Sequence, residues 1–403
     1  MNQYKSAIEK ELKDNILQFW LKYTIDKESG GFYGYISYDN QVKRFAPKGA
    51  VLNARILWTF AEAYQHFKQP EYLQAAKRAF DYIRQYFIDE EYGGVYWMVD
   101  HQGNPLETKK QVYAVAFTIY AFAAYYKATN DNTALMDALT LFNDLEKYAF
   151  DSIKGGYYEA FSREWELLED LRLSDKDANE AKTMNTHLHV LEAYTTLYEV
   201  SKDRQVKRQL EHLIALFEEK IINENAHFNL FFDENWVLKS SAVSYGHDIE
   251  GSWLLEEAAR ALEDQPTLER IRKTSLKMAS VTLEEGLDQN GAVLNELHGD
   301  GTLDDELHWW PQAEGTVGFL NAYQLSSDPK YLDAAFRLWD FIQGRLINKE
   351  YGEWYWRVDA NGIPNLNDEK VGPWKCPYHN GRACLELLYR IKQLEDISQT
   401  SAQ

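Results

Sequence analysis

Cysteine is nearly absent from this sequence, whose 403 residues include only Cys376 and Cys384. A small secreted scaffold depends on several disulfides, and a structural zinc site needs closely spaced cysteine and histidine ligands. Neither pattern is present, and the cysteine content fits a reducing compartment. Cys376 lies near a histidine, but no local sequence signature supports a nucleophilic role for it.

Long apolar segments are also missing. The longest apolar run, residues 113–126, is too short to cross a lipid bilayer as a helix. The first residues lack the apolar core of a secretory leader. We therefore expect a cytoplasmic protein that does not associate with membranes.

Basic residues are in the minority. Lysine and arginine number 43 against 63 aspartates and glutamates, which gives a formal net charge of −20. This balance disfavours binding to nucleic acid and to anionic membranes, and it disfavours a polyanionic substrate. We expect the ligand to be a neutral or weakly charged small molecule.

No segment rich in proline, glycine or serine divides the chain. With 45% hydrophobic residues, the sequence can build a large core. We expect one domain over residues 1–391, followed by a polar, frayed tail over residues 392–403. For the assembly we expect a monomer or a weak homodimer.

A signature of glycine and aromatic residues returns six times, at intervals of roughly 60 to 75 residues. This spacing suits a repeated helix–loop–helix unit. Its strongest copies are residues 29–33 (SGGFY), 92–97 (YGGVYW) and 154–158 (KGGYY), and its weaker copies are residues 227–231, 290–294 and 351–356.

Two predicted helices flank each copy of the signature. One is amphipathic and should have one side in water: residues 8–23, 71–87, 134–150, 206–222, 267–285 and 331–347. The other is apolar nearly all round and should be buried: residues 51–67, 112–126, 184–200, 247–262, 312–325 and 378–391.

Six buried helices that alternate with six amphipathic helices predict an all-α fold, an (α/α)6 barrel with short β-hairpin-like loops. An open solenoid of helix pairs is the alternative. A solenoid would not require one helix of every pair to be so apolar, and the pattern therefore favours a closed ring.

Polar residues fall at the start of each predicted inner helix. They are Arg55, Tyr113, Asn185, His189, His247, Glu250, Glu314 and His379. If the ring closes, these helix ends meet at one mouth, where free N–H groups and positive dipole ends also point. Taken singly, each residue has an ordinary structural explanation as an ion pair, a helix cap or a core residue. Their common position in the repeat favours a shared pocket.

His247 and Glu250 are three residues apart and should share one helix face. A carboxylate there can accept the ring N–H, orient the imidazole and raise its basicity. Asn185 and His189, four residues apart, should also share a face, whereas His187 should point elsewhere and be structural. The remaining histidines fall at other positions of the repeat and receive no catalytic role: His66, His101, His212, His227, His298 and His308.

Tryptophans accompany these polar residues. Trp309 and Trp310 lead into the fifth inner helix, and Trp374 comes shortly before His379. Aromatic rings beside polar side chains are typical of a sugar pocket, because the apolar faces of a pyranose stack on them. Core packing is the alternative explanation for some of the twelve tryptophans.

Several reaction classes lack their motifs. The sequence contains no P-loop, dinucleotide glycine pattern, zinc-type His-Glu-x-x-His or Gly-x-Ser-x-Gly elbow. A glycoside hydrolase would need two opposed carboxylic acids, whereas imidazoles move protons in both directions near neutral pH. This favours an aldose 2-epimerase or an aldose–ketose isomerase, with Arg55 and Asn185 at the enediolate oxygens.

Two other classes remain open. A glycoside hydrolase or lyase could use Glu250 or Glu314 as its acid. A sugar-binding or regulatory protein without turnover would use the same pocket for recognition alone.

Over nearly its whole length the sequence resembles the N-acylglucosamine 2-epimerase superfamily, and most closely its cellobiose 2-epimerase branch. The most specific segments are residues 184–194 (MNTHLHVLEAY), 246–250 (GHDIE) and 309–314 (WWPQAE). The resemblance implies the (α/α)6 barrel. It also implies epimerisation of a reducing-end sugar at C2 without a metal or nucleotide cofactor.

The resemblance further implies roles for individual residues. His247 and His379 would be the acid/base pair at C2, His189 would assist ring opening, and Glu250 would pair with His247. Arg55, Tyr113 and Asn185 would bind the reducing-end sugar near O1 and O2. Trp310 and Trp374 would stack on sugar rings, and Asp177 would contact the second sugar.

The sequence departs from the cellobiose 2-epimerase pattern at Val115, where we expect glutamine. The superfamily also includes mannose 2-epimerases and mannose isomerases. A preference for free monosaccharides is therefore the alternative to a disaccharide substrate.

Overall fold

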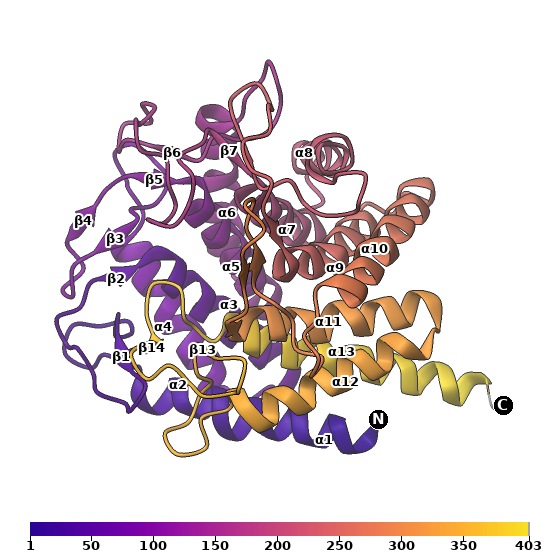
Figure 1. Cartoon of the computed structure of the whole chain (residues 1–403). Helices are drawn as coiled ribbons and strands as arrows, with labels where there is room; N and C mark the ends of the chain where they lie inside the picture. Colours follow the sequence, from indigo (N-terminus) through magenta and orange to yellow (C-terminus); the bar gives the residue numbers. More distant parts are fainter. Residues whose placement is uncertain (402–403) are drawn as a thin grey trace.

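The computed structural model describes the backbone of residues 1–401 and the side chains of residues 1–397. Within this part, twelve helices alternate between an inner and an outer ring, and short strands lie in the loops (Figure 1). The predicted all-α (α/α)6 barrel is confirmed. None of the described helices combines the length and the apolar character needed to cross a lipid bilayer.

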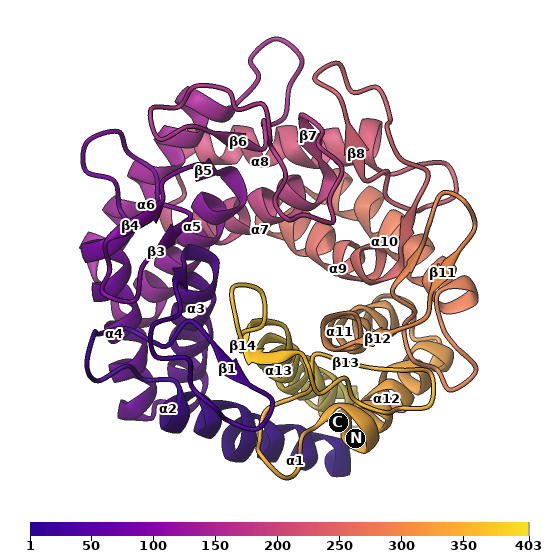
Figure 2. The same ribbon diagram turned by 60° about the vertical axis from the view of Figure 1, so that its left-hand side comes forward.

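The inner ring contains one helix from each repeat. Its members are α3 (Ala50–Phe67), α5 (Val112–Thr129), α7 (Met184–Ser201), α9 (Tyr245–Ala261), α11 (Trp309–Ser326) and α13 (Tyr378–Ser401). Each packs against the next, and α13 packs against α3 (Figure 2). The ring is therefore closed, which excludes the open solenoid.

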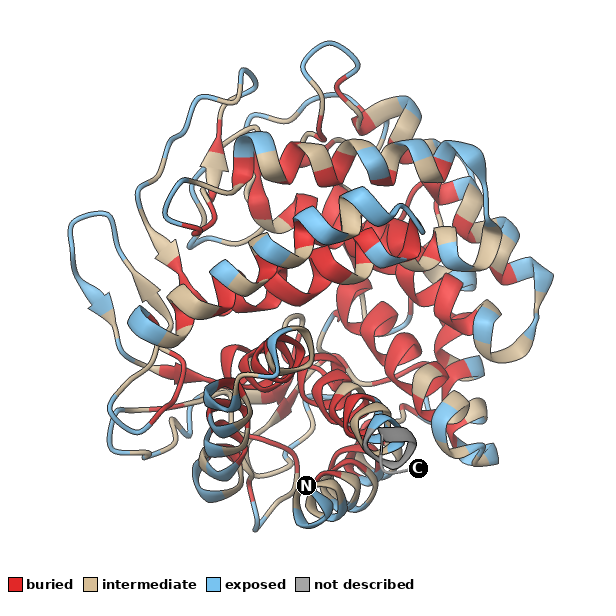
Figure 3. Ribbon diagram, turned by 90° about the vertical axis from the view of Figure 1, so that its right-hand side faces the viewer, coloured by how far each residue is buried: buried red, intermediate tan, exposed pale blue. Residues whose placement is uncertain are grey.

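The outer ring contains the amphipathic helices. They are α1 (Asn2–Lys10), continued by η1 (Glu11–Leu17) and α2 (Gln18–Tyr23), then α4 (Pro70–Tyr86), α6 (Asn132–Asp144) with η2 (Leu145–Ala149), α8 (Arg204–Leu216) with η3 (Phe217–Ile221), α10 (Gln265–Glu285), and α12 (Pro329–Phe341) with η4 (Ile342–Leu346). The η segments are single π-helical stretches within or at the end of these helices. The outer helices expose one side, whereas the inner helices are buried almost throughout (Figure 3).

Residue patterns explain this division. In α5 every residue from Val112 to Tyr125 is buried. In α8 the buried residues include Val206, Leu210, Leu213 and Ile214, which recur at three- and four-residue steps on one face. Packing thus follows the apolar periodicity of each helix.

The first and the last helices lie side by side, because α1 packs against α13. Helix α13 spans Tyr378–Ser401 and so continues through residues 392–401 of the predicted polar tail. Residues 402 and 403 of that tail lie outside the described residues.

The glycine and aromatic signature forms the same tight loop in every repeat, closed by one antiparallel bridge. The six bridges are Ile25–Phe32, Ile88–Val95, Phe150–Tyr157, Ile222–Phe228, Leu287–Val293 and Ile347–Trp354. Gly31 shows why glycine is used here. Its φ is +61°, and a Cβ atom would lie 2.7 Å from the ring of Tyr82.

Short strands stand directly before five of the inner helices, and each pairs antiparallel with a strand of the following repeat. The pairs are β2 (Lys48–Gly49) with β3 (Met98–Val99), β5 (Lys110–Gln111) with β6 (Ala160–Phe161), β7 (Lys182–Thr183) with β8 (Phe231–Phe232), β9 (Val243–Ser244) with β10 (Glu296–Leu297), and β12 (Leu307–His308) with β13 (Arg357–Val358). Strands β4 (Pro105–Glu107) and β11 (Leu303–Asp304) extend two of these sheets, and β14 (Glu369–Val371) pairs with β1 (Ile36–Ser37). The pairing fixes the N-terminal ends of the inner helices around one mouth.

Buried ion pairs hold the same region. In three repeats a strand lysine reaches the aspartate that follows the preceding outer helix. The pairs are Lys48–Asp26 at 2.8 Å, Lys110–Asp89 at 2.7 Å and Lys182–Asp151 at 2.7 Å. Each pair links the start of an inner helix to the signature loop of its own repeat.

Candidate active site

The N-terminal ends of the inner helices surround a cavity of about 410 Å³. All but one of the predicted site residues line it: Arg55, Tyr113, Asp177, Asn185, His189, His247, Glu250, Trp309, Trp310, Trp374 and His379. The exception is Glu314, which contacts His379 from outside the cavity. Side chains from six separate helices and their loops therefore converge on one space.

His379 is held by a carboxylate. Its Nδ1 lies 2.7 Å from Oε1 of Glu314, a residue of α11, and the other oxygen of Glu314 accepts a hydrogen bond of 3.2 Å from Trp253. When Nδ1 donates to this carboxylate, Nε2 carries the lone pair. Burial and the charges of Arg55 and Arg382 hold the pKa of His379 well below its usual value.

His247 has a neutral partner. Its Nδ1 lies 2.7 Å from the hydroxyl of Ser244, the residue before α9. Burial lowers the pKa of His247 to about 3. The ring packs on Trp310 at a centroid distance of 4.7 Å, and His379 packs on the same indole at 5.8 Å. The two imidazoles thus contact the same tryptophan.

The predicted pairing of Glu250 with His247 is wrong. Glu250 Oε1 lies 2.6 Å from a guanidinium nitrogen of Arg382, a residue of α13. A guanidinium is a stronger partner for a buried carboxylate than a neutral imidazole is, because it brings a full positive charge. Burial and the nearby charge of Glu314 raise the pKa of Glu250 to about 7.

Hydrogen-bonding groups face the cavity from the opposite side. Arg55 donates a hydrogen bond of 2.7 Å to the Tyr113 hydroxyl, while its Nε is buried without a partner. Asn185 also has a buried oxygen without a partner. His189 Nδ1 lies 2.9 Å from Oε2 of Glu192. Unsatisfied buried groups that line a cavity are ready to bind a polar ligand.

Aromatic rings form the rest of the wall. Trp374 packs against Tyr113 at 5.8 Å, and Trp309 packs against Trp356 at 4.8 Å. The loop of residues 173–177 covers another side of the cavity. Within it, Asp177 accepts hydrogen bonds from the backbone and hydroxyl of Ser174 at 2.8 and 2.9 Å, which shape a tight turn.

Sequence reasoning missed several residues of this region. His308 and Trp356 line the cavity, although His308 was assigned no role. Arg382 and Glu192, directly behind the cavity, were also missed. The signal was present for both: Glu192 follows His189 by three residues, and Arg382 follows His379 by three, the same spacing that drew attention to Glu250.

Two further residues singled out from the sequence, His187 and Val115, lie away from the cavity. His187 is fully buried, with Nδ1 2.6 Å from the Thr183 carbonyl and Nε2 accepting from the Tyr157 backbone at 2.8 Å, so its structural role agrees with the prediction. Val115 is fully buried and lies outside the cavity lining.

Among the residues that the structure describes, two groups of side chains have the composition of a metal site. Glu250, Glu314 and His379 lie close enough together to share an ion, as do Asp304, Glu306 and His308. In both groups a guanidinium already neutralises carboxylate charge. Arg382 lies 2.6 Å from both carboxylates of the first group, and Arg357 contacts Glu306 at 2.6 Å. These contacts fit an arginine-centred ion-pair network better than a cation cage.

Fold and cavity together define a carbohydrate-active protein of the (α/α)6-barrel class. The chain belongs to the N-acylglucosamine 2-epimerase family, whose sequence model matches residues 31–383. It is 48% identical to the cellobiose 2-epimerase of Bacteroides fragilis, over 95% of this chain and 98% of that one.

Solved structures agree with this assignment. The cellobiose 2-epimerase of Spirochaeta thermophila is similar with a TM-score of 0.93 and 41% identity, over 98% of both chains. A D-mannose isomerase has a TM-score of 0.84 at 21% identity, over 95% of this chain and 97% of that one. The latter likeness shows the shared fold alone.

Proposed function

We propose that this protein is a sugar 2-epimerase that interconverts glucose and mannose at the reducing end of β-1,4-linked disaccharides of the cellobiose type. The observation that carries the proposal is that His247 and His379 line one cavity and both contact Trp310 there. The similarity to cellobiose 2-epimerases over nearly the whole chain supports the choice of substrate.

The two imidazoles are the proton-transfer groups of the proposed reaction. Both His247 and His379 have pKa values below the usual histidine range because they are buried, so both are neutral at pH 7 and either can accept a proton. After ring opening, which His189 assists, one imidazole removes the C2 proton to give a cis-enediolate. The intermediate rotates, the other imidazole takes up a proton from solvent and donates it to the opposite face of C2, and the first imidazole, protonated in the abstraction step, releases its proton to solvent.

Glu314 orients His379 for this task. A carboxylate that accepts the Nδ1 proton leaves Nε2 as the basic atom, and it stabilises the imidazolium that forms when a proton arrives. The neutral Ser244 gives His247 no such charge. The two bases are therefore supported in different ways.

Arg55, Tyr113 and Asn185 are the proposed ligands of the sugar oxygens at C1 and C2. A guanidinium, a phenol and an amide can all hydrogen-bond an enediolate, and charge that develops there is stabilised most by donors fixed in advance. The Arg55–Tyr113 hydrogen bond of 2.7 Å and the buried position of Arg55 provide that fixation.

The cavity has the size of a small-molecule site. Its volume of about 410 Å³ falls within the range of roughly 300–1,000 Å³ typical of small-molecule sites. Trp310 is the proposed platform for the reducing-end ring, between the two histidines. Trp374, Trp309 and the turn held by Asp177 lie along the wall and are the proposed contacts of the second ring.

A mannose 2-epimerase or mannose isomerase that acts on free monosaccharides is the alternative with the same chemistry. A glycoside hydrolase fits the geometry less well. Its two carboxylic acids must face each other across the bond to be cleaved, whereas Glu250 and Glu314 converge on one nitrogen of Arg382.

Incubation with cellobiose and with mannose in D2O tests the proposal. We expect deuterium at C2 of the reducing-end sugar and formation of its epimer with cellobiose. Deuterium in mannose alone would support the monosaccharide alternative. Release of a new reducing end, or binding without isotope exchange, would refute the epimerase assignment.

We also propose that residues 1–391 form a single catalytic domain and that the protein is a cytoplasmic monomer or weak homodimer. Light scattering across a range of concentrations would test the assembly state. A mass that stays dimeric at nanomolar concentration would contradict it.

A further inference from the structure

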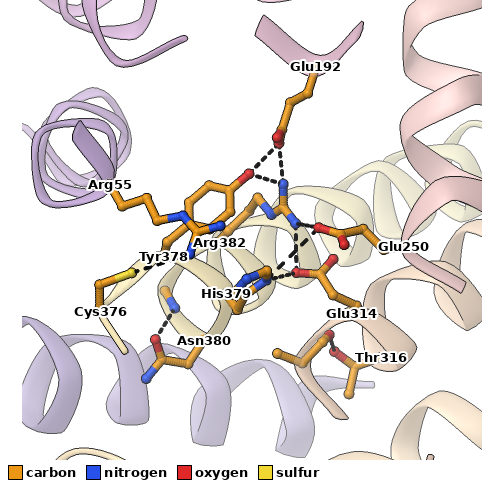
Figure 4. A network of polar contacts seen from close by, with 12 residues as sticks. Arg55, Glu192, Glu250, Glu314, Thr316, Cys376, Tyr378, His379, Asn380 and Arg382 are labelled. Atoms are coloured by element: carbon orange, nitrogen blue, oxygen red, sulfur yellow. Dashed lines mark hydrogen bonds and ion pairs between the residues drawn. The ribbon is translucent and has the colours of Figure 1, made fainter. Parts of the chain in front are cut away.

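Arg382 lies behind the cavity and joins four inner helices (Figure 4). It belongs to α13, and its guanidinium contacts Glu192 of α7, Glu250 of α9 and Glu314 of α11. Nη2 lies 2.6 Å from Oε1 of both Glu250 and Glu314, and Nη1 contacts Glu192. Arg382 is almost fully buried, and three carboxylates converge on its guanidinium, whose Nε has no partner.

Two of these carboxylates each hold a histidine of the cavity. Glu192 Oε2 lies 2.9 Å from His189 Nδ1, and Glu314 Oε1 lies 2.7 Å from His379 Nδ1. An ionised carboxylate can only accept hydrogen bonds. An imidazole beside an ionised carboxylate therefore holds a proton on Nδ1, and in its neutral form the lone pair is on Nε2.

We propose that Glu192 and Arg382 are positioning residues for the reaction. Glu192 fixes the tautomer and the ring orientation of His189. Arg382 is the shared countercharge that keeps Glu192 and Glu314 in place, and it thereby couples His189 and His379. This inference rests on the proposed function for its kinetic consequences, while the tautomer itself can be measured without substrate.

The charge balance supports the assignment. Three buried carboxylates meet one guanidinium, and a buried carboxylate without a countercharge is costly. Burial alone would raise the pKa of Glu192, but the charge of Arg382 and the hydrogen bond from His189 lower it to about 2. Glu192 is therefore ionised at neutral pH.

The shape of the guanidinium matters as well as its charge. It lies between the rings of Trp253, at 4.7 Å, and Tyr378, at 4.2 Å. The Tyr378 hydroxyl in turn contacts Glu192 and Arg382. A planar, stacked group that serves three carboxylates at once is a geometry that the single ammonium of lysine does not reproduce.

Glu192→Gln is the direct test. One oxygen of Glu192 faces Arg382 and Tyr378, and the other faces His189. The amide oxygen of glutamine should settle on the Arg382 side and point its NH2 group at His189 Nδ1. We expect ring ¹⁵N spectra of histidine-labelled protein, assigned with His189→Asn, to show the proton of His189 moving from Nδ1 to Nε2.

The kinetic readout separates positioning from general destabilisation. A wrong tautomer removes the assistance that His189 gives to ring opening, so we expect kcat to fall about 100-fold, the lower end of the range for general acid–base catalysis. KM should change less than kcat, because the variant leaves the contact surface of the cavity intact. Circular dichroism and thermal unfolding show whether the fold is kept.

Glu146→Gln is the matched control. Glu146 accepts hydrogen bonds from Tyr157 and Tyr194 at 2.7 and 2.8 Å and lies outside the cavity lining. The substitution makes the same chemical change, from carboxylate to amide. We expect both the kcat and the His189 tautomer to stay as they are in the unmodified protein.

Arg382→Lys and Arg382→Met test the shared countercharge. Arg382→Lys keeps the positive charge but loses the forked guanidinium. The kcat of this variant should therefore lie between those of the unmodified protein and of Arg382→Met. If Arg382→Met does not fold, the lysine variant and Glu192→Gln decide the question.

Two results would overturn the positioning role: an unchanged His189 tautomer in Glu192→Gln, or full kcat in either Arg382 variant. A tautomer switch would support it even if the unmodified protein turned over no sugar. That outcome would count against the proposed function alone.

Discussion

The different partners of His247 and His379 predict what each histidine can still do alone. In a reaction with two bases, each imidazole serves one face of C2. We expect His247→Asn and His379→Asn each to lose epimerisation by about 10²- to 10⁴-fold, the contribution of a positioned acid or base. The imidazole that remains should still remove the C2 proton of its own epimer and return deuterium from D2O to the same face.

The structure indicates that both variants will fold. In His379→Asn, Glu314 loses one donor but keeps Arg382 at 2.6 Å, so the cost should be about 1–3 kcal/mol, that of one unsatisfied buried group. His247 shares its hydrogen bond with the neutral Ser244, and its loss should lie at the lower end of that range. Both costs are below the roughly 5–15 kcal/mol typical of whole-protein stability.

The assay follows the C2 proton by NMR in D2O, starting separately from cellobiose and from its mannose-ended epimer. One variant should exchange only the first sugar and the other variant only the second. Exchange of the same epimer by both variants, or epimerisation near the original rate in either, would refute the two-base reasoning.

Further predictions concern stability. Lys48→Met should lower the free energy of unfolding by about 3–5 kcal/mol, as expected when one partner of a buried ion pair is removed. Lys110→Met should cost less, because Arg163 also pairs with Asp89, at 2.9 Å; equal losses in urea unfolding would contradict this. Burial raises the pKa of Glu159 from 4.5 to about 8, so the stability of the unmodified protein should fall as pH rises between these values. Glu159→Gln lacks this dependence and should therefore gain relative stability with pH, whereas a constant difference in melting temperature between pH 5 and pH 8 would refute the shift.

The fold could be predicted because its evidence is local. Apolar periodicity and the repeated glycine signature are properties of short segments, and the predicted inner helices begin within three residues of the observed ones. Short β-hairpin-like loops were predicted, but the strand pairing between repeats was not. Most strands are only two or three residues long and pair with a strand of another repeat, as Lys48 does with Val99, so the cause of this pairing lies far away in the sequence. Strands β4 and β11 instead pair within their own repeat.

The site could be predicted in part, for the same reason. The position of a residue within its repeat indicated which side chains lie at the mouth of the barrel. In a closed ring, equivalent positions of successive repeats surround the same end of the barrel. Hydrogen-bond partners did not follow from spacing. Glu192 does contact His189, three residues before it, whereas Glu250 pairs with Arg382 and not with His247. Local spacing brings two groups to one face, but a buried charge from another helix decides which contact forms.

The position of Val115 indicates that other residues must decide the substrate preference. Its departure from the cellobiose 2-epimerase pattern suggested a different substrate, but the side chain is fully buried and touches no part of the cavity. A residue that cannot contact the sugar can act on preference only through packing. Besides Trp309 at the start of α11, several groups along the cavity wall lie in loops: Trp374 before α13, Trp356 after η4, and the turn of residues 173–177. Trp356 and Trp374 belong to the sixth repeat and the turn to the third, so the helical ring can supply one proton-transfer chemistry while loops from two repeats set the length of sugar that enters.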